Sequence, residues 1–262
     1  MTANLSLSDE KQRFVEKIYR GSSIDYRHSV LGDFGRSPED FSFFSKTKGL
    51  TPEPTTARRN AVYAEESNAL AEAATKSVCS ELGADTDGIT HLITASCTGF
   101  AAPGFDVHLL DSVGLRRSIE RYHLGFMGCF AAIPALRLAD HICRSTPDAQ
   151  VLVVNTEICT LHFNTASEAD TLVINSLFAD GASAALISAD PGLSEGRKVA
   201  LSGFGTATLA EGHDEMAWIV GDHGFEMKLS AGVPRLPPRR PDPIHHAPAR
   251  PRPWHRCREP SQ

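Results

Sequence analysis

The chain has 262 residues, 41% of them hydrophobic, and a formal net charge of −6 at pH 7, so it can bury a substantial core in one large domain or two small ones. The acidic balance argues against a general nucleic-acid binder, and the absence of any run of 18 apolar residues argues against a membrane span. The six cysteines have neither C-x-x-C nor zinc-ligand spacing, and the polar N-terminus lacks a signal-peptide core, so we expect free thiols, no metal site and a cytoplasmic protein.

Two helices are expected in the first third of the chain. The first spans Leu7 to Arg20, with Ser8 as its N-cap. The second is alanine-rich and spans Asn60 to Leu82, where Gly83 ends it. Three basic residues recur on one face of the first helix: Arg13, Lys17 and Arg20. A solvated surface is the simplest interpretation of that stripe.

Strands dominate the middle of the sequence. Gly88–Ser96 is the first convincing strand, and Val151–Val154 is an apolar run typical of a strand covered on both faces. Asp180–Ser183 is expected to form a tight turn into a buried strand, Ala184–Ile187, and Val199–Ala210 a longer, half-exposed strand. Helices that alternate with buried strands predict an α/β protein with helices on both faces of the sheet.

The segment Phe126–Ala132 has the pattern of a cysteine nucleophile placed where a helix begins. A strand-like stretch, Arg121–Gly125, precedes it, and apolar residues at helical spacing follow. The positive end of the helix dipole would lower the pKa of the Cys129 thiol and favour the reactive thiolate. The alternative is a small buried cysteine in an apolar helix.

The composition changes after Val233. The segment Pro234–Gln262 holds nine prolines and seven arginines, and proline at this density excludes helix and sheet interiors. A disordered basic arm, a polyproline-like docking segment and the product of a reading-frame change all fit. We favour the frame change, because GC-rich DNA read out of frame tends to give such a proline- and arginine-rich run, and because the tail interrupts the well-patterned stretch Phe225–Leu229 in mid-element. The predicted domain therefore covers residues 1–233, and 234–262 form a separate tail.

Short motifs from His91 onward stand in a characteristic order. They are His91-Leu92-Ile93, Cys97-Thr98-Gly99 with Pro103-Gly104-Phe105-Asp106, Arg121-Tyr122 with Gly128-Cys129-Phe130-Ala131, Val151-Leu152-Val153-Val154 with Glu157, and Leu177-Phe178-Ala179-Asp180-Gly181-Ala182. Over residues 11–233 this succession resembles the chalcone synthase-like, or type III polyketide synthase, family of the thiolase fold.

The resemblance implies an α/β, thiolase-like layered fold, with mixed sheets sandwiched by helices, of which this chain holds mainly the N-terminal half. It implies an acyltransferase that loads an acyl group from a coenzyme A thioester onto Cys129. Decarboxylated malonyl-CoA units then condense with that group. It implies no permanently bound cofactor, acyl-CoA and malonyl-CoA as substrates, and a homodimer.

The resemblance also assigns roles to other residues. Phe178 matches a phenylalanine that gates the channel from the coenzyme A tunnel to the cavity; an ordinary core aromatic is the alternative. Four residues match positions that shape the substrate cavity: Cys97, Thr98, Cys159 and His162. Plain packing is equally compatible with these four. The stripe of Arg13, Lys17 and Arg20 resembles basic residues that hold coenzyme A phosphates.

The sequence departs from the family in one respect that bears on activity. The family's histidine and asparagine lie in His-Pro-Gly-Gly-like and Asn-x-Gly-Asn-like stretches, and this sequence contains neither. The family's first strand would also precede residue 1. We therefore expect little or no condensing activity from the chain as written. The alternatives are a non-catalytic remnant or dimer partner of an intact homologue, and another thiolase-fold condensing enzyme resembling ketoacyl-carrier-protein synthase III.

Overall fold

A mixed four-stranded sheet forms the centre of the molecule. The computed structural model describes residues 2–193, 198–208, 212, 215–230 and 233. The strand order is β2-β1-β3-β4; β1 pairs in parallel with β2 and β3, and β4 is antiparallel to β3. The strands are β1 (His91–Ser96), β2 (Glu120–Gly125), β3 (Gln150–Ile158) and β4 (Asp180–Ser188).

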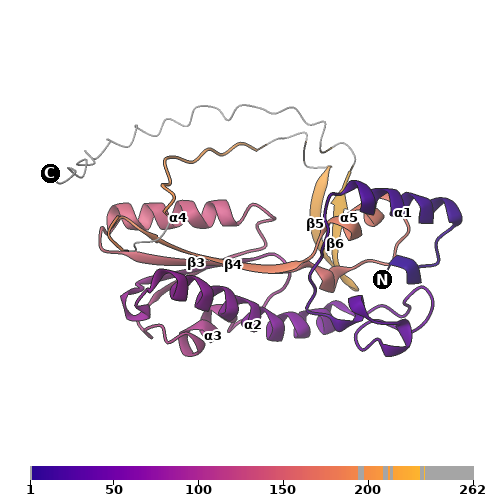
Figure 1. Cartoon of the computed structure of the whole chain (residues 1–262), viewed down its shortest axis with the longest axis horizontal. Helices are drawn as coiled ribbons and strands as arrows, with labels where there is room; N and C mark the ends of the chain where they lie inside the picture. The colour runs from indigo at the N-terminus through magenta and orange to yellow at the C-terminus, as the bar shows by residue number, and fades with distance from the viewer. Residues whose placement is uncertain (1, 194–197, 209–211, 213–214, 231–232, 234–262) are drawn as a thin grey trace, which may run out of the picture.

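Helices cover both faces of this sheet (Figure 1). Helices α2 (Thr56–Leu82) and α3 (Phe105–Ser112) lie on one face, and α4 (Ala132–Ser145) lies on the other. Alternate strand residues enter the two cores, as the pleat requires: Leu92 belongs to the cluster that includes α3, whereas Ile93 belongs to the cluster that includes α4. The predicted α/β architecture with helices on both sheet faces is confirmed.

A second group of elements gathers at one end of the sheet (Figure 1). Helix α1 (Asp9–Gly21) lies beside α5 (Ala169–Leu177), and a hairpin of β5 (Met216–Gly221) and β6 (Gly224–Leu229) stands next to them. Short 3-10 turns complete the described chain: Thr2–Asn4, Gly32–Gly35, Pro38–Asp40, Thr86–Gly88 and Cys159–His162. Among all the residues that the structure describes, no helix has both the length and the apolar character that crossing a bilayer requires.

The two predicted helices are confirmed together with their caps. The Ser8 hydroxyl accepts the Lys11 backbone N–H at 3.4 Å at the start of α1. Helix α2 begins at Thr56, four residues earlier than expected, because Thr55 caps it. Gly83 ends α2 in the left-handed region at φ 58°, where glycine has no steric penalty.

One turn prediction and one strand prediction are wrong, whereas the strand predicted at Ala184–Ile187 is confirmed as part of β4. Asp180–Ser183 is no turn but the start of β4, which is only partly buried; pairing of Gly181 with Glu157 on β3 overrides the turn preference of its small residues. Residues 199–208 form no strand, because they pair with no other strand in the described part of the chain; Leu209 and Ala210 lie outside it.

The stretch Phe225–Leu229 is not cut off in mid-element. It lies within β6, whose last residue, Leu229, pairs with Met216 at the far end of the hairpin. The Ser230 N–H then donates to the Glu215 carbonyl at 2.9 Å and closes the hairpin. The argument for a frame change that relied on an interrupted element is therefore lost. The predicted tail, residues 234–262, lies outside the described residues.

Candidate active site

Cys129 lies in the turn between β2 and α4, three residues before α4 begins, and its side chain is exposed. The backbone reaches this turn through two left-handed residues, Phe126 at φ 54° and Gly128 at φ 85°. A bulky residue such as Phe126 adopts that region at a cost of about 1–3 kcal/mol, and such strain gathers at functional sites. The rings of Phe100, at 5.3 Å, and Phe225, at 5.6 Å, hold Phe126 in place.

The predicted lowering of the Cys129 thiol pKa is wrong. Burial raises the pKa of Cys129, and the negative charge of Glu157 raises it further, whereas the cysteine's own backbone N–H lowers it less. Although the Cys129 side chain reaches solvent, protein atoms surround much of the sulfur. The helix dipole weakens quickly outside the first turn, and Cys129 precedes that turn. The thiol is therefore the favoured form at neutral pH.

Glu157, near the end of β3, is the centre of a hydrogen-bond network. Its two carboxylate oxygens accept the Cys97 backbone N–H at 2.9 and 3.0 Å, and one of them accepts the Thr98 hydroxyl at 2.8 Å and the Ser96 hydroxyl at 3.4 Å. Burial raises the pKa of Glu157 despite these donors. The sequence motif included Glu157, but no role was predicted for it; a carboxylate at the end of a buried strand was the available signal.

Cys97 and Cys159 complete a cluster of three thiols around Glu157. The Gly128 N–H donates to the buried Cys97 sulfur at 3.1 Å, and the Cys97 thiol faces the Gly128 carbonyl at 3.3 Å. Burial, with Glu157, raises the pKa of Cys97 to about 11. Burial also raises the pKa of Cys159, and the negative charges of Glu157 and Asp180 add to this effect. Of the three thiols, Cys129 alone is exposed.

His162 and Thr98 lie with the thiol cluster and are hydrogen-bonded to each other. The His162 Nε2–H donates to the Thr98 carbonyl at 2.8 Å, and its Nδ1 accepts the Phe225 N–H at 2.9 Å. Burial lowers the pKa of His162 to about 4, so its ring is neutral. The Thr98 hydroxyl also accepts the Ile158 N–H at 2.8 Å. Since both ring nitrogens of His162 are hydrogen-bonded within the protein, neither is free to bond a ligand, and only van der Waals contact with the ring is left.

The β5–β6 hairpin contributes two residues that sequence reasoning missed. The Trp218 indole N–H donates to the Cys97 carbonyl at 2.8 Å. The Phe225 ring stacks on the His162 ring with centroids 4.2 Å apart. These contacts join segments more than 60 positions apart along the chain, so no local pattern pointed to them.

Phe178 and the basic stripe lie on the neighbouring α1–α5 pair. Phe178 is half-buried and directly follows α5, and it takes no part in the hydrogen bonds that join Glu157 to its neighbours. The three basic side chains of the predicted stripe are exposed on α1: Arg13, Lys17 and Arg20. Lys17 and Leu177 line a hollow of about 360 Å³ between α1 and α5. The structure therefore brings Lys17 close to the segment that leads into Phe178.

Residues 42–191, more than half of the chain, match the family described as chalcone and stilbene synthases, N-terminal domain. The chain belongs to the chalcone and stilbene synthase family. The matched range contains Cys129, Glu157 and the other residues of the thiol cluster, whereas the basic stripe on α1 lies before it.

Individual polyketide synthases are also similar in sequence to most of this chain. The α-pyrone synthesis polyketide synthase-like Pks18 of Mycobacterium tuberculosis is 31% identical over 88% of this chain and 58% of its own length. Probable polyketide synthase 1 of Dictyostelium discoideum is 29% identical over 86% of this chain and 7% of its own length.

Solved structures agree with the predicted thiolase-like fold. The C-terminal type III polyketide synthase domain of Steely1 from Dictyostelium superposes with a TM-score of 0.76, at 28% identity, over 89% of this chain and 62% of that domain. CsyB, solved as a complex with CoA-SH, gives a TM-score of 0.72 at 25% identity over 90% of this chain and 63% of its own. The chain thus spans about three fifths of these structures.

Proposed function

We propose that this chain supplies the acyl-carrying cysteine of a type III polyketide synthase, with Cys129 as the nucleophile. The observation that carries the proposal is the position of Cys129: it is the exposed thiol of a three-cysteine cluster, at a strained turn before α4. Membership in the chalcone and stilbene synthase family supports acyl transfer as the reaction.

The loading step uses the thiolate of Cys129. Its sulfur attacks the carbonyl carbon of an acyl-CoA thioester, a new carbon–sulfur bond forms, and the bond to the coenzyme A sulfur breaks. Coenzyme A leaves as a thiolate and takes up the proton that Cys129 lost. Because burial and Glu157 raise the pKa of Cys129, we expect loading by this chain to accelerate as the pH rises above neutral.

Coenzyme A is proposed to approach over α1 and α5. The exposed cations of α1 suit a multiply charged phosphate, and the hollow beside Lys17 offers apolar surface that includes Leu177, the residue before Phe178. The binding of CoA-SH by CsyB, a similar structure, supports this choice of substrate. Coenzyme A thioesters act here as substrates, and no resident cofactor is proposed.

Condensation with malonyl-CoA is proposed to be weak or absent in this chain. Decarboxylation needs positioned donors at the developing enolate, and acid–base and oxyanion groups each contribute about 10²–10⁴-fold. His162 is a poor substitute for the family's histidine, because both of its ring nitrogens are already bonded and it is neutral. Loading without extension is the activity that these residues support.

A second copy of the chain or an intact homologue is the proposed partner, in a homodimer or a mixed dimer. Three large apolar side chains around Cys129 are exposed: Met127, Phe130 and Ile133. Surfaces of this kind mark association sites. We assign the protein to the cytoplasm, which the free state of the five described cysteines supports.

Incubation of the whole chain with acyl-CoA at pH 8, followed by mass spectrometry of the intact protein, tests the proposal. We expect one acyl group on the peptide that contains Cys129, removable by hydroxylamine, with an equal amount of free coenzyme A. Cys129→Ala should abolish the adduct, and Cys143→Ala, on the far part of α4, should not. If the adduct persists in Cys129→Ala, or if the unaltered chain forms no adduct, a non-catalytic partner becomes the better description of this chain.

A further inference from the structure

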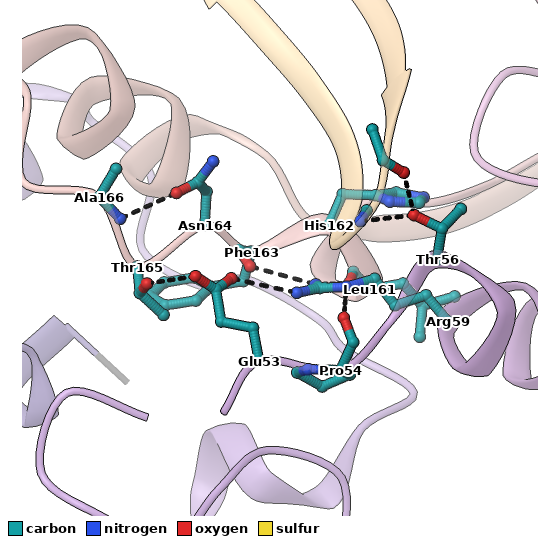
Figure 2. Close-up of polar contacts among 12 residues, drawn as sticks. Glu53, Pro54, Thr56, Arg59, Leu161, His162, Phe163, Asn164, Thr165 and Ala166 are labelled. Carbon is teal, nitrogen blue, oxygen red and sulfur yellow. Dashed lines mark hydrogen bonds and ion pairs between the residues drawn. The ribbon is translucent and has the colours of Figure 1, made fainter. Parts of the chain in front are cut away.

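Arg59, in the first turn of α2, is a buried cation that contacts the loop bearing His162. Its side chain is 0% exposed. Its Nε–H donates to the Pro54 carbonyl at 3.0 Å, and its Nη2 lies 3.3 Å from a Glu53 carboxylate oxygen (Figure 2). Burying a guanidinium beside one carboxylate is costly, and an apolar side chain of similar volume often packs at lower cost. The burial of Arg59 therefore calls for a specific role.

The guanidinium of Arg59 holds the loop that carries His162. Its Nη1 donates to the Phe163 carbonyl at 3.2 Å and also to the Leu161 carbonyl, which are the two neighbours of His162 in sequence (Figure 2). The ion-pair partner of Arg59 holds the same loop further on, because Glu53 accepts the Thr165 hydroxyl at 2.6 Å. Only the planar fork of an arginine offers several fixed donors in these directions.

The turn of the β5–β6 hairpin rests on the same arginine. A Cβ atom added at Gly224 would lie 3.0 Å from Arg59 Nε, so the hairpin backbone packs directly against the guanidinium. The Thr56 hydroxyl accepts the Gly224 N–H at 2.8 Å and donates to the Gly221 carbonyl. Arg59 thus contacts both segments that meet at His162: the loop that bears it and the hairpin whose Phe225 N–H donates to it.

We propose that Arg59 is a positioning residue that fixes His162 between the Thr98 carbonyl and the Phe225 N–H and so holds the hairpin over the Cys97 side of the site. The hairpin then reaches the thiol cluster through the Trp218 hydrogen bond to the Cys97 carbonyl. The description of this site as an acylation site rests on the proposed function. The contacts of Arg59 are independent of that function.

Two measurements on the full chain, made without any acyl-CoA, test the proposal. Ring ¹⁵N shifts report the tautomer of His162, and acrylamide quenching reports the exposure of Trp218 in a Trp254→Phe background. In Arg59→Met we expect His162 to lose its single Nε2–H tautomer and Trp218 to become more accessible. Arg59→Lys, which keeps the charge but not the planar fork, should show nearly the same changes in both signals as Arg59→Met. Arg58→Met, an exposed neighbour on the same helix, should change neither signal.

A folded Arg59→Met chain, judged by circular dichroism, with unchanged His162 and Trp218 signals would overturn the proposal. If Arg59→Met does not fold, Glu53→Gln is tested instead, because it removes the charge beside the guanidinium while preserving the size of the side chain. The same changes in the His162 and Trp218 signals are expected, but smaller. Unchanged signals in Glu53→Gln would then overturn the proposal. Failure of Cys129 to take an acyl group would count against the proposed function alone, since neither signal depends on acylation.

Discussion

The charge of Glu157 opposes thiolate formation at each cysteine around it. Its carboxylate raises the pKa of Cys97, Cys129 and Cys159, although in each case burial is the larger cause. A nucleophilic cysteine ordinarily lies in electropositive surroundings. Cys129 in this chain lies beside a carboxylate instead, so its reactivity is restrained until another group or a higher pH removes the proton.

Replacement of Glu157 by glutamine should make Cys129 more reactive. Removing the negative charge favours the thiolate, so the pKa of Cys129 should fall, and the pH profile of its alkylation by iodoacetamide should move to lower pH. At pH 7 the rate should rise. Glu65→Gln, on an exposed position of α2, serves as the control and should leave the profile unchanged. An alkylation profile that does not move in Glu157→Gln would contradict this electrostatic account.

At the scale of elements, the β5–β6 hairpin depends on docking for its stability. A two-stranded hairpin alone is at best marginally stable in water. Phe225 anchors this one, because its buried ring stacks on His162 and contacts the rings of Trp218, Phe100 and Phe126. The hairpin and the candidate active site are therefore expected to order together.

Phe225→Ala should lower the free energy of unfolding by about 3–5 kcal/mol, the range for a buried aromatic side chain. Urea denaturation followed by Trp218 fluorescence measures the change. Ile219→Ala on the neighbouring strand provides the comparison; its side chain is 61% exposed, and its effect should stay within about 0.5 kcal/mol. Equal effects of the two substitutions would show that the hairpin is not anchored through Phe225.

At the scale of the whole molecule, the surface around Cys129 is unusually apolar for a segment exposed to water. Phe130 is 54% exposed, Ile133 49% and Met127 42%, all within seven consecutive residues. Single exposed apolar residues are common on protein surfaces, but clusters of this kind favour association. The chain is therefore expected to pair through this surface.

The double substitution Phe130→Ser and Ile133→Ser should weaken self-association about tenfold or more, which corresponds to about 1.4 kcal/mol. Sedimentation equilibrium gives the dissociation constant. Tyr26→Ser, which removes an aromatic side chain that is 83% exposed on another segment, should leave the constant unchanged. A double variant that associates as tightly as the original chain would place the interface elsewhere.

Much of the fold followed from local patterns. The caps at Ser8 and Gly83, the apolar run Val151–Val154 and the cysteine just before α4 were predicted, because each depends on residues within one or two turns. The strand predicted at Val199–Ala210 is not found over residues 199–208, because local strand preference makes a strand only where a partner strand exists.

Ordered motifs and local periodicity were enough to predict the family, the α/β fold and the identity of the candidate nucleophile. The surroundings of that nucleophile depend instead on contacts between distant segments. Glu157 reaches Cys97 across 60 positions, and the hairpin reaches His162 across 63. Burial and charge from such distant residues set the thiol pKa, and so the pKa of Cys129 is raised where the helix dipole alone had predicted a lowered one.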